Sequence, residues 1–364
     1  MIDIPSALTH LPDVFTAADA AKAGLSKHVL GRGVRRGSLR RLAGGVFVAA
    51  EVWDDALAWQ RHLLLVRAAS HERPDAVVSH HSDAVLHDLP LPTHAPEWVA
   101  MTTNHGVTTA NLGGLSRLEP GLLPDDHKAS ARGMPVTGIA RTLCDCLRSL
   151  SLPEAVAMVD AALGRGLVTV DEIEKVRRTQ FRWPGVTRVD LGLSLHDPVR
   201  ETWLESTGLT DLWLHGIPLP ECQVSVFGVV GEFLGRPDAI WRKHAVALEL
   251  DGRGKYLSGV AADLPVSEVA STVAAAVIAE KLREDSLRSP GLFVVRADSH
   301  EASQDIAAVA RRLRDAFRTH DPRNFRGRLE VHPRARITPD NPGPEAPQYG
   351  DLLRWAPRKG GRKR

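Results

Sequence analysis

The apolar run of residues 245–250, AVALEL, restricts the fold of this chain more than any other stretch. A continuous apolar run of this length is typical of a central strand that is buried on both faces. Two acids mark its end, Glu249 and Asp251, and their spacing of two positions places them on the same face of a strand. A third acid, Asp238, precedes the run and could reach them from an adjacent strand. Residues 232–256 are therefore predicted to form an acid-bearing hairpin.

These carboxylates have two interpretations. Their oxygen atoms suit Mg²⁺ (or Mn²⁺), because Mg²⁺ is usually held by one or two carboxylates together with substrate phosphates. Alternatively, the strand ends in an ordinary polar turn, since Asp251-Gly252 is a strong turn signal. The spacing of the acids does not by itself decide between the two.

The distribution of charge points to a polyanionic partner such as DNA. The chain has 364 residues and a formal net charge of only +2, and its length indicates two or three domains. Positive charge nevertheless gathers near the start and in the last seven residues. The basic residues near the start are Lys22, Lys27, Arg32, Arg35, Arg36, Arg40 and Arg41.

The cysteines and the apolar segments indicate a cytoplasmic protein without a membrane partner. The three cysteines, Cys144, Cys146 and Cys222, are too few for a four-ligand zinc site and are expected to be buried or idle thiols of a reducing compartment. The N-terminus lacks a basic start followed by an apolar core, so no signal peptide is expected. No run approaches the roughly 18 apolar residues of a membrane span.

Residues 15–48 predict a helix-turn-helix followed by a hairpin. Thr16 and Ser26 are good N-caps for two short helices, of which the second covers about residues 27–36 and ends at Gly37. Residues 39–48 contain Gly44-Gly45 and predict a small β-hairpin, the wing. A basic second helix can enter the major groove of DNA while the wing meets phosphates, although a helical hairpin with solvated charges fits the same pattern. The candidate DNA-binding residues are Lys27, Arg32, Arg35, Arg36, Arg40 and Arg41.

This segment resembles the N-terminal winged helix of AbiEi-type antitoxins of abortive-infection systems. The matching residues are Phe15-Thr16, Gly24-Leu25-Ser26, Gly37 and the stretch of residues 41–48. The middle region resembles the second domain of that family in VVSHHSDAVLHDLPL, MPVTGIARTLCDC and EAVAMVDAALGRGLVT. The resemblance implies autoregulatory DNA binding, with a cognate toxin or a second copy of the chain as further partner. The adjacent His80 and His81 point in different directions and are expected to be core or capping residues rather than metal ligands.

The C-terminal region predicts alternating helices and strands. Residues 181–197 are expected to be a linker, and residues 199–215 a helix that carries Glu201 and Glu205 on one face. A short strand over residues 223–227 and the two strands of the acid-bearing hairpin follow, then a helix over residues 269–289, a strand over 292–296 and a closing helix over 306–320. The predicted order is therefore α-β-β-β-α-β-α.

That order, with those acids, resembles the PD-(D/E)XK restriction-endonuclease-like fold, in the branch near very-short-patch-repair endonucleases. The resemblance implies that Asp238 is the first acid of the motif and Glu249 the second, with Glu205, or Glu201, as the acid of the N-terminal helix. The implied metal ligands are Asp238, Glu249 and Glu205. Gln223 and the blocks ELDGRGKY and AEKLREDSLRSPGLFVVR complete the match.

One departure from the motif concerns its lysine. The usual position, two residues after the second acid, is occupied by Asp251. The cation is then expected from Lys255 or from Lys281 on the following helix, while Asp251 or Glu205 holds a second metal or orients the attacking water.

The sequence as a whole predicts an α/β protein, α+β overall, in four parts. These are a winged-helix domain over residues 1–50, a mixed middle domain over 51–196, a restriction-endonuclease-like core over 197–321, and a Pro-rich basic tail over 322–364 that is expected to be disordered. The expected function is DNA binding with Mg²⁺-dependent endonuclease activity, in phage defence or DNA repair. The alternative is a non-catalytic AbiEi-like antitoxin or transcriptional regulator that keeps a degenerate nuclease fold.

Overall fold

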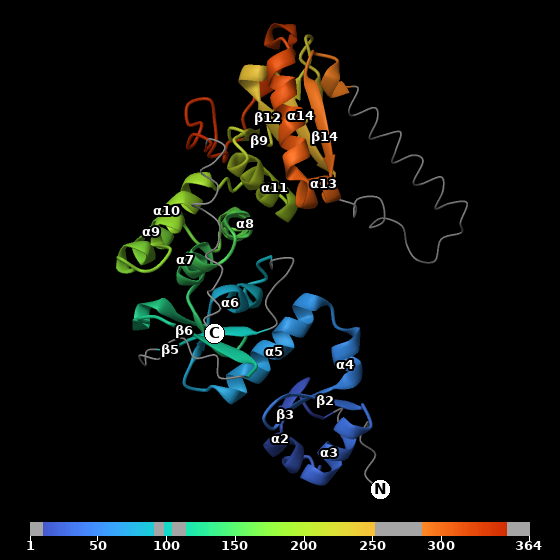
Figure 1. The fold of residues 1–364 in the computed structure, drawn as a ribbon, viewed down its shortest axis with the longest axis vertical. Coiled ribbons are helices and arrows are strands. Elements are labelled where there is room, and N and C mark those ends of the chain that lie inside the picture. Colours follow the sequence, from blue (N-terminus) through green and yellow to red (C-terminus); the bar gives the residue numbers. More distant parts are fainter. Residues whose placement is uncertain (1–9, 91–97, 104–113, 252–285, 348–364) are drawn as a thin grey trace, which may run out of the picture. The chain divides into compact units, whose positions relative to one another are not determined.

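A computed structural model describes residues 10–90, 98–103, 114–251 and 286–347 (Figure 1). Helices and mixed sheets give the chain an α+β fold, as the sequence predicts. The chain divides into two compact units, which are described separately here. Unit 1 comprises Met1–Cys146 and Val168–Trp183, and unit 2 comprises Leu147–Leu167 and Pro184–Arg364. In the described parts of the chain, no helix is both long enough and apolar enough to cross a bilayer.

The first part of unit 1 is a three-stranded sheet, in the order β1-β3-β2, with two short helices. Thr16 caps the first helix, since its Oγ1 accepts from the backbone N of Asp19 at 3.2 Å and the Asp19 carboxylate accepts from the Thr16 backbone N at 2.9 Å. Ser26 caps the second by accepting from the Val29 backbone N at 3.4 Å, so both predicted helix starts are confirmed. The elements are β1 (Val14–Thr16), α2 (Ala17–Lys22), α3 (Lys27–Arg35), β2 (Leu39–Ala43), β3 (Val46–Ala49) and α4 (Ala50–Asp55).

Helix α3 packs closely on β2. A Cβ atom at Gly33 would lie only 2.8 Å from Leu39 Cδ1, so the close approach depends on glycine at this position. Gly37 has a φ of +76° and turns the chain from α3 into β2. Leu30, Leu39 and Phe47 are buried in the resulting core. The opposite side of α3 remains exposed and carries its basic residues.

The second part of unit 1 is a five-stranded mixed sheet in the order β6-β5-β4-β8-β7, with helices packed on it. Strands β5 and β6, and β4 and β8, are parallel, while β4–β5 and β7–β8 are antiparallel. The elements are α5 (Ala58–Glu72), β4 (Val77–Val78), α6 (His80–Leu86), β5 (Val99–Thr103), β6 (Ser116–Pro120), η1 (Asp125–His127), β7 (Lys128–Ala131), β8 (Met134–Thr137), α7 (Ile139–Ser149) and α9 (Val170–Thr179).

Buried polar side chains join α5 and α6 to this sheet. His62 Nε2 lies 2.9 Å from Ser82 Oγ, which also accepts from the Ala100 backbone N at 2.9 Å. His81 Nε2 lies 3.3 Å from the Trp98 carbonyl oxygen. His80 and His81 are 8% and 2% exposed, so the predicted core position of this pair is confirmed.

Unit 2 contains two sheets and the helices around them. The larger sheet has the order β14-β13-β12-β9, in which β13 and β14 are parallel and the other pairs antiparallel, and the smaller has the order β11-β10-β15. The elements are α8 (Leu152–Gly164), α10 (Val186–Leu195), α11 (Trp203–Leu214), β9 (Glu221–Cys222), β10 (Ser225–Phe227), β11 (Phe233–Gly235), β12 (Ala239–Trp241), η2 (Arg242–His244), β13 (Val246–Asp251), β14 (Phe293–Asp298), α13 (Ser299–Gln304), α14 (Ile306–Thr319), η3 (Pro322–Asn324) and β15 (Arg328–Glu330).

The two faces of the larger sheet are covered differently. One face, which includes Leu248 and Val295, packs against residues of α11 and α14 such as Leu209 and Val309. The other face, which includes Ala247 and Val294, packs against the smaller sheet. The strand predicted from the apolar run is therefore buried on both faces, and it is an inner strand of the sheet.

Three expectations for unit 2 are corrected. The expected linker over residues 181–197 contains α10, whose Val189 and Leu193 are buried in a helical pattern. Helix α11 starts at Trp203 rather than near residue 199, because Thr202 adopts an extended conformation and caps it. Glu201 therefore precedes the helix and does not share a helical face with Glu205. The expected domain limit at residue 196 also falls inside unit 2.

The expected disorder of the C-terminal tail does not extend over residues 322–347. Strand β15 pairs with β10 in this segment, and Ile337 is 1% exposed. The Asp197 carboxylate accepts from the backbone N of Arg336 and of Ile337, at 3.1 and 3.2 Å. Prolines disfavour an α-helix here, but the pairing of β15 and the backbone hydrogen bonds that the buried Asp197 accepts order the segment. Residues 348–364 lie outside the described part of the chain.

Candidate functional site

Asp238 lies immediately before β12, beside the end of β13 that carries Glu249. Strand β12 pairs antiparallel with β13, with Ala239 opposite Leu248, and continuing this register by one position sets Asp238 opposite Glu249. Glu249 is 4% exposed on a strand whose other residues are mostly apolar. Asp238 is half-buried, and its Oδ2 accepts from the Leu250 backbone N at 2.7 Å. Burying a carboxylate in an apolar strand costs folding free energy. The burial of Glu249 close to a second acid therefore calls for a functional explanation.

Glu205 stands beside this pair. The side chain is 4% exposed in the first turn of α11. One carboxylate oxygen accepts from the Glu201 backbone N at 3.0 Å and from Gln223 Nε2 at 3.4 Å, and the other accepts from Thr202 Oγ1 at 2.9 Å. Burial raises the pKa of Glu205, and the negative charge of Asp238 raises it further. The structure therefore brings Glu205, rather than Glu201, to the acidic pair.

Asp251 is held by a cation that sequence reasoning missed. Arg296 donates to Asp251 Oδ2 through Nε at 3.0 Å and through Nη2 at 2.6 Å. In the parallel register of β13 and β14, Arg296 also stands opposite Glu249. The side chains of Asp251 and Arg296 remain 24% and 27% exposed, so this ion pair lies where the strand ends meet solvent. Lys255 and Lys281, the predicted sources of the cation, lie outside the described residues.

The chemistry of this donor set fits a hard divalent cation. Asp238 and Glu249 offer carboxylate oxygens, and the repulsion between Asp238 and Glu205 is one that a cation would relieve. Within the described residues, no three His, Cys, Asp or Glu side chains are grouped so that they could hold a metal ion. Two carboxylates are nevertheless a usual protein contribution to a Mg²⁺ site, because substrate phosphates and water supply the remaining ligands.

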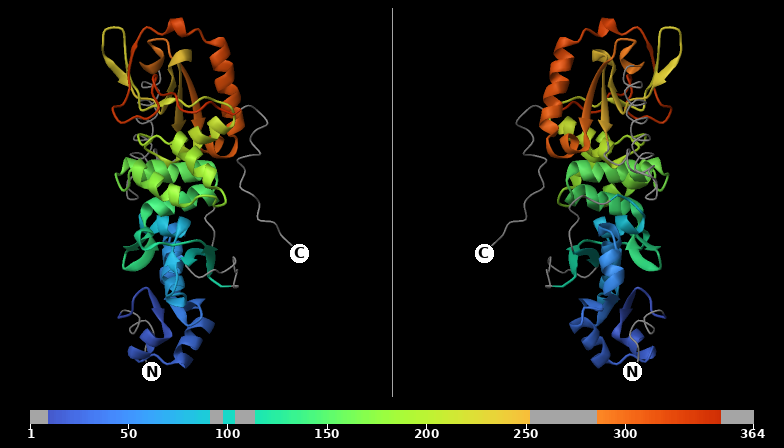
Figure 2. Two further views of the ribbon diagram at one scale, coloured as in Figure 1. Left: turned by 90° about the vertical axis from the view of Figure 1, so that its left-hand side faces the viewer. Right: turned by 90° about the vertical axis from the view of Figure 1, so that its right-hand side faces the viewer.

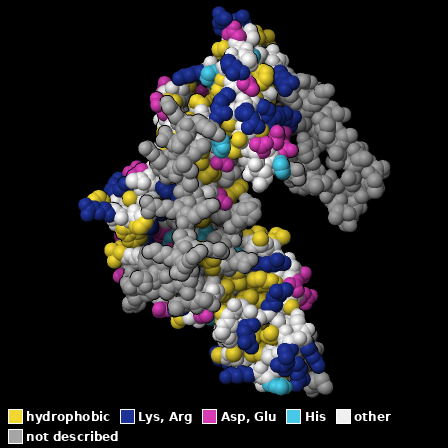
Figure 3. Space-filling model, viewed as in Figure 1, with side chains coloured by type: hydrophobic (Ala, Val, Ile, Leu, Met, Phe, Trp, Pro, Cys, Tyr) yellow, Lys and Arg dark blue, Asp and Glu magenta, His cyan; other side chains and the backbone are white. Residues whose placement is uncertain are grey.

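Unit 1 carries the second candidate site, a basic surface. Figure 3 shows Lys and Arg side chains gathered over the part of unit 1 that contains α2, α3 and β2. All six predicted DNA-binding residues are exposed: Lys27, Arg32, Arg35 and Arg36 at α3, and Arg40 and Arg41 on β2. Between residues 10 and 49 these side chains and Lys22 oppose only Asp13 and Asp19. Positive charge therefore exceeds negative charge over residues 10–49, and Glu51, Asp54 and Asp55 follow in α4.

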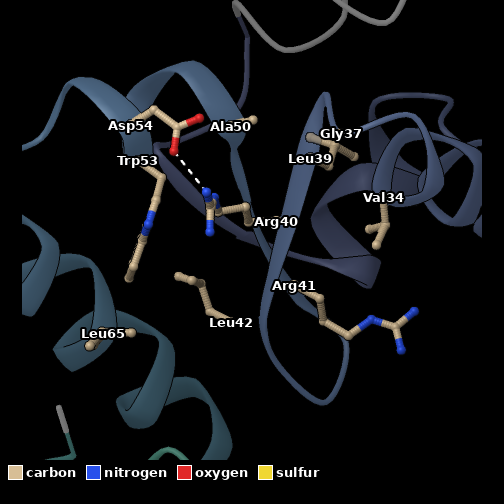
Figure 4. Close-up of a pocket in the computed structure, with 10 residues that line it drawn as sticks. All are labelled: Val34, Gly37, Leu39, Arg40, Arg41, Leu42, Ala50, Trp53, Asp54 and Leu65. Atoms are coloured by element: carbon tan, nitrogen blue, oxygen red, sulfur yellow. Dashed lines mark hydrogen bonds and ion pairs between the residues drawn. The ribbon is translucent and has the colours of Figure 1, made fainter.

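Arg40 differs from its neighbours because it already has an acidic partner. Its Nη2 lies 2.9 Å from Asp54 Oδ1, and the guanidinium lies 5.8 Å from the centre of the Trp53 ring. These residues line a pocket of about 550 Å³ (Figure 4). In that view Arg40 and Asp54 point toward each other, whereas Arg41 extends away from Trp53. Arg41 is therefore the residue of β2 that is better placed to meet a phosphate.

No family model matches the chain. Two curated proteins of Mycobacterium tuberculosis are similar to it: uncharacterized protein MT2308 of strain CDC 1551 / Oshkosh and uncharacterized protein Rv2248 of strain ATCC 25618 / H37Rv. Each is 27% identical to this chain over 214 residues, which cover 54% of the chain and 77% of the relative. Neither name states an activity, so the function proposed below rests on the geometry of the two sites.

Proposed function

We propose that this chain hydrolyses phosphodiester bonds of nucleic acid with Mg²⁺ or Mn²⁺ held by Asp238 and Glu249, with Glu205 beside them. The observation that carries the proposal is the approach of Asp238 to the end of β13 that carries the buried Glu249, where Asp238 Oδ2 accepts from the Leu250 backbone N at 2.7 Å. The restriction-endonuclease-like resemblance of the same region agrees with it. The buried free thiols of Cys144, Cys146 and Cys222 suit the reducing cytoplasm, in which phage defence or DNA repair would take place.

Each group of the site has a distinct task in this proposal. Asp238 and Glu249 would hold the divalent cation, which when bound polarises the phosphoryl oxygens and lowers the pKa of a water molecule. Hydrogen bonds from Thr202, Gln223 and the Glu201 backbone fix the Glu205 carboxylate beside Asp238, where it can orient that water. Arg296 places positive charge next to the carboxylates and would stabilise the negative charge that develops on the phosphoryl group.

A cleavage assay tests this proposal. The purified chain is incubated with labelled single-stranded and duplex DNA in Mg²⁺, in Mn²⁺ and in chelator, beside the Asp238→Ala variant. Cleavage by the wild type is expected only with a divalent cation, at a rate at least about 100-fold above that of the variant. Equal cleavage by the two proteins, or none by the wild type under any condition, contradicts the proposal.

A second proposed function is duplex DNA binding through α3 and β2. The exposure of all six basic residues on one small domain favours it. It is compatible with the hydrolase, because binding through unit 1 would locate DNA. Duplex DNA binding is equally compatible with the alternative function, a non-catalytic AbiEi-like regulator. In that case unit 2 would contact a cognate toxin or a second copy of the chain. Cation-dependent cleavage in the assay above supports the hydrolase, and its absence supports the non-catalytic regulator.

The double variant Arg35→Ala/Arg36→Ala is expected to bind duplex DNA at least about tenfold more weakly than the wild type at low salt. Each phosphate contact adds about 0.9 to the steepness with which log affinity decreases against log salt concentration. The loss of two contacts should therefore make this dependence shallower by about 1.8. Fluorescence anisotropy at several salt concentrations measures both quantities. Arg177→Ala/Arg178→Ala on α9 is the matched control, because it also removes two adjacent arginines from a helix of unit 1. Equal losses in the two double variants would contradict a specific role for α3.

A further inference from the structure

The hairpin formed by β10 and β11 exposes an unusual amount of apolar surface. Val229 and Val230 at its turn are 74% and 89% exposed, and Phe233 at the start of β11 is 61% exposed. Turns normally carry Gly, Asn, Asp or Ser, which interact well with water. The hairpin projects from the body of unit 2 in both views of Figure 2, where it is yellow. A projecting apolar tip of this kind indicates a contact surface.

A row of three side chains crosses the outer face of the smaller sheet behind this tip. Phe227 stands opposite Phe233 in β11 and opposite Arg328 in β15. The two phenyl rings meet edge to face with centroids 5.7 Å apart, and the Arg328 guanidinium lies 4.3 Å from the Phe227 ring centre. The inner face, with Val226, Leu234 and Leu329, is packed in the core. The row therefore presents aromatic rings and a guanidinium away from the core.

The same hairpin leads directly into the carboxylate site. Only Arg236 and Pro237 separate the end of β11 from Asp238. Ile240 and Ala247 pack against the smaller sheet, and alternation along β12 and β13 places Asp238 and Glu249 on that same face of the larger sheet. From Phe233 to Asp238 the chain can span at most about 17 Å. The aromatic row and the carboxylates thus lie on opposite sides of the smaller sheet, and this short connection joins them.

We propose that the outer face of β11-β10-β15, with the Val229–Val230 tip, stacks unpaired bases of a single-stranded nucleic acid on the hairpin that leads into the carboxylate site. This inference rests on the proposed hydrolase and names its substrate class. Aromatic rings on an exposed sheet stack on any base, and guanidinium groups add cation–π and phosphate contacts. Arg236 and Arg326 are exposed close to the row in the chain, while Arg236 lies 3.9 Å from Glu201 and Arg328 forms an ion pair with Glu330. Bases paired within a duplex would not offer their faces to these rings.

The test compares binding of fluorescein-labelled oligothymidine and of a duplex of equal length to the full chain, in chelator so that cleavage plays no part. Phe233→Ala is expected to weaken binding of the single strand about tenfold and to leave duplex binding unchanged, whereas Phe233→Trp keeps single-strand binding. Phe181→Ala is the matched control, because Phe181 is 70% exposed, against 61% for Phe233, and lies outside the smaller sheet. It is expected to bind both probes like the wild type.

Unchanged single-strand affinity in Phe233→Ala overturns the inference. A change in oligomeric state of Phe233→Ala, seen by light scattering with unchanged oligothymidine affinity, also overturns it and identifies the row as a protein interface. Because the readout is binding without divalent cation, it is independent of hydrolysis. If the wild type does not cleave DNA, the proposed hydrolase activity is ruled out. The stacking surface is then still tested by the measured binding affinities alone.

Discussion

Replacing Arg296 with Ala is expected to slow phosphodiester cleavage by about 100-fold, equivalent to roughly 2.7 kcal/mol of transition-state stabilisation. Arg296 is the cation that the described structure places beside the carboxylates, and two of its guanidinium nitrogens bond Asp251. Its loss would leave the negative charge that develops on the phosphoryl group uncompensated. The measurement is the rate of cleavage of a labelled single strand at saturating Mg²⁺.

Two further variants separate this role from a structural one. Arg296→Lys keeps the positive charge and should recover part of the rate, and Asp251→Asn should lower the rate less than Arg296→Ala because the cation remains. The ion pair is partly exposed, so its loss should cost only about 1 kcal/mol of folding stability, which thermal unfolding would show as a small change. Cleavage by Arg296→Ala at the wild-type rate would place the required cation elsewhere, as Lys255 or Lys281.

Lowering the pH from 7.5 to 5 is expected to destabilise unit 1 by about 4 kcal/mol. Burial lowers the pKa of His62 to about 4 and that of His81 to about 3, against about 6.5 in the unfolded chain. The folded state therefore disfavours the protonated form. Stability is fully present above pH 6.5 and is lost as the pH falls toward these folded values, at about 2 kcal/mol for each histidine by pH 5.

Urea unfolding is carried out at pH 7.5, 6 and 5, and hydrogen exchange of peptides from α5 and α6 is used to detect it. This measures how the stability of unit 1 changes with pH. His81→Phe keeps an aromatic ring beside Trp98 but does not titrate, so it should lose about half of the pH dependence. The exposed His28→Gln should keep all of it. A pH dependence that is the same in wild type and His81→Phe would show that the buried histidines do not control acid stability.

Local signals allowed the short-range features of the fold to be predicted from the sequence. Thr16 and Ser26 are residues that cap helices, and they do so. The approach of Asp238 to β13 also follows from local order, because two strands joined by a short turn pair antiparallel. Burial of His80 and His81 agrees with the expectation that they are core or capping residues.

Features that depend on distant pairing were not predictable. Arg296 reaches the acidic site because β14 pairs parallel with β13, and the two residues of its ion pair are 45 positions apart in the chain. Helix α10 was missed because the break signal Trp183-Pro184-Gly185 immediately precedes it, while its buried residues become evident only against the rest of unit 2. The order of residues 322–347 depends on a side chain far along the chain, Asp197, that accepts from their backbone.

The rate of single-strand cleavage by Asp238→Asn, compared with the exposed-site control Asp340→Asn, tests the central claim most directly. Asp238→Asn keeps the shape of the side chain and removes the charge beside the end of β13 that carries Glu249, whereas Asp340 is exposed near the C-terminal end of the described chain. With Mg²⁺ or Mn²⁺, the control should cleave like the wild type and Asp238→Asn at least about 100-fold more slowly, and chelator should abolish all cleavage. Cleavage that survives chelator, or that proceeds equally in Asp238→Asn and Asp340→Asn, would contradict a cation-dependent site at the paired carboxylates.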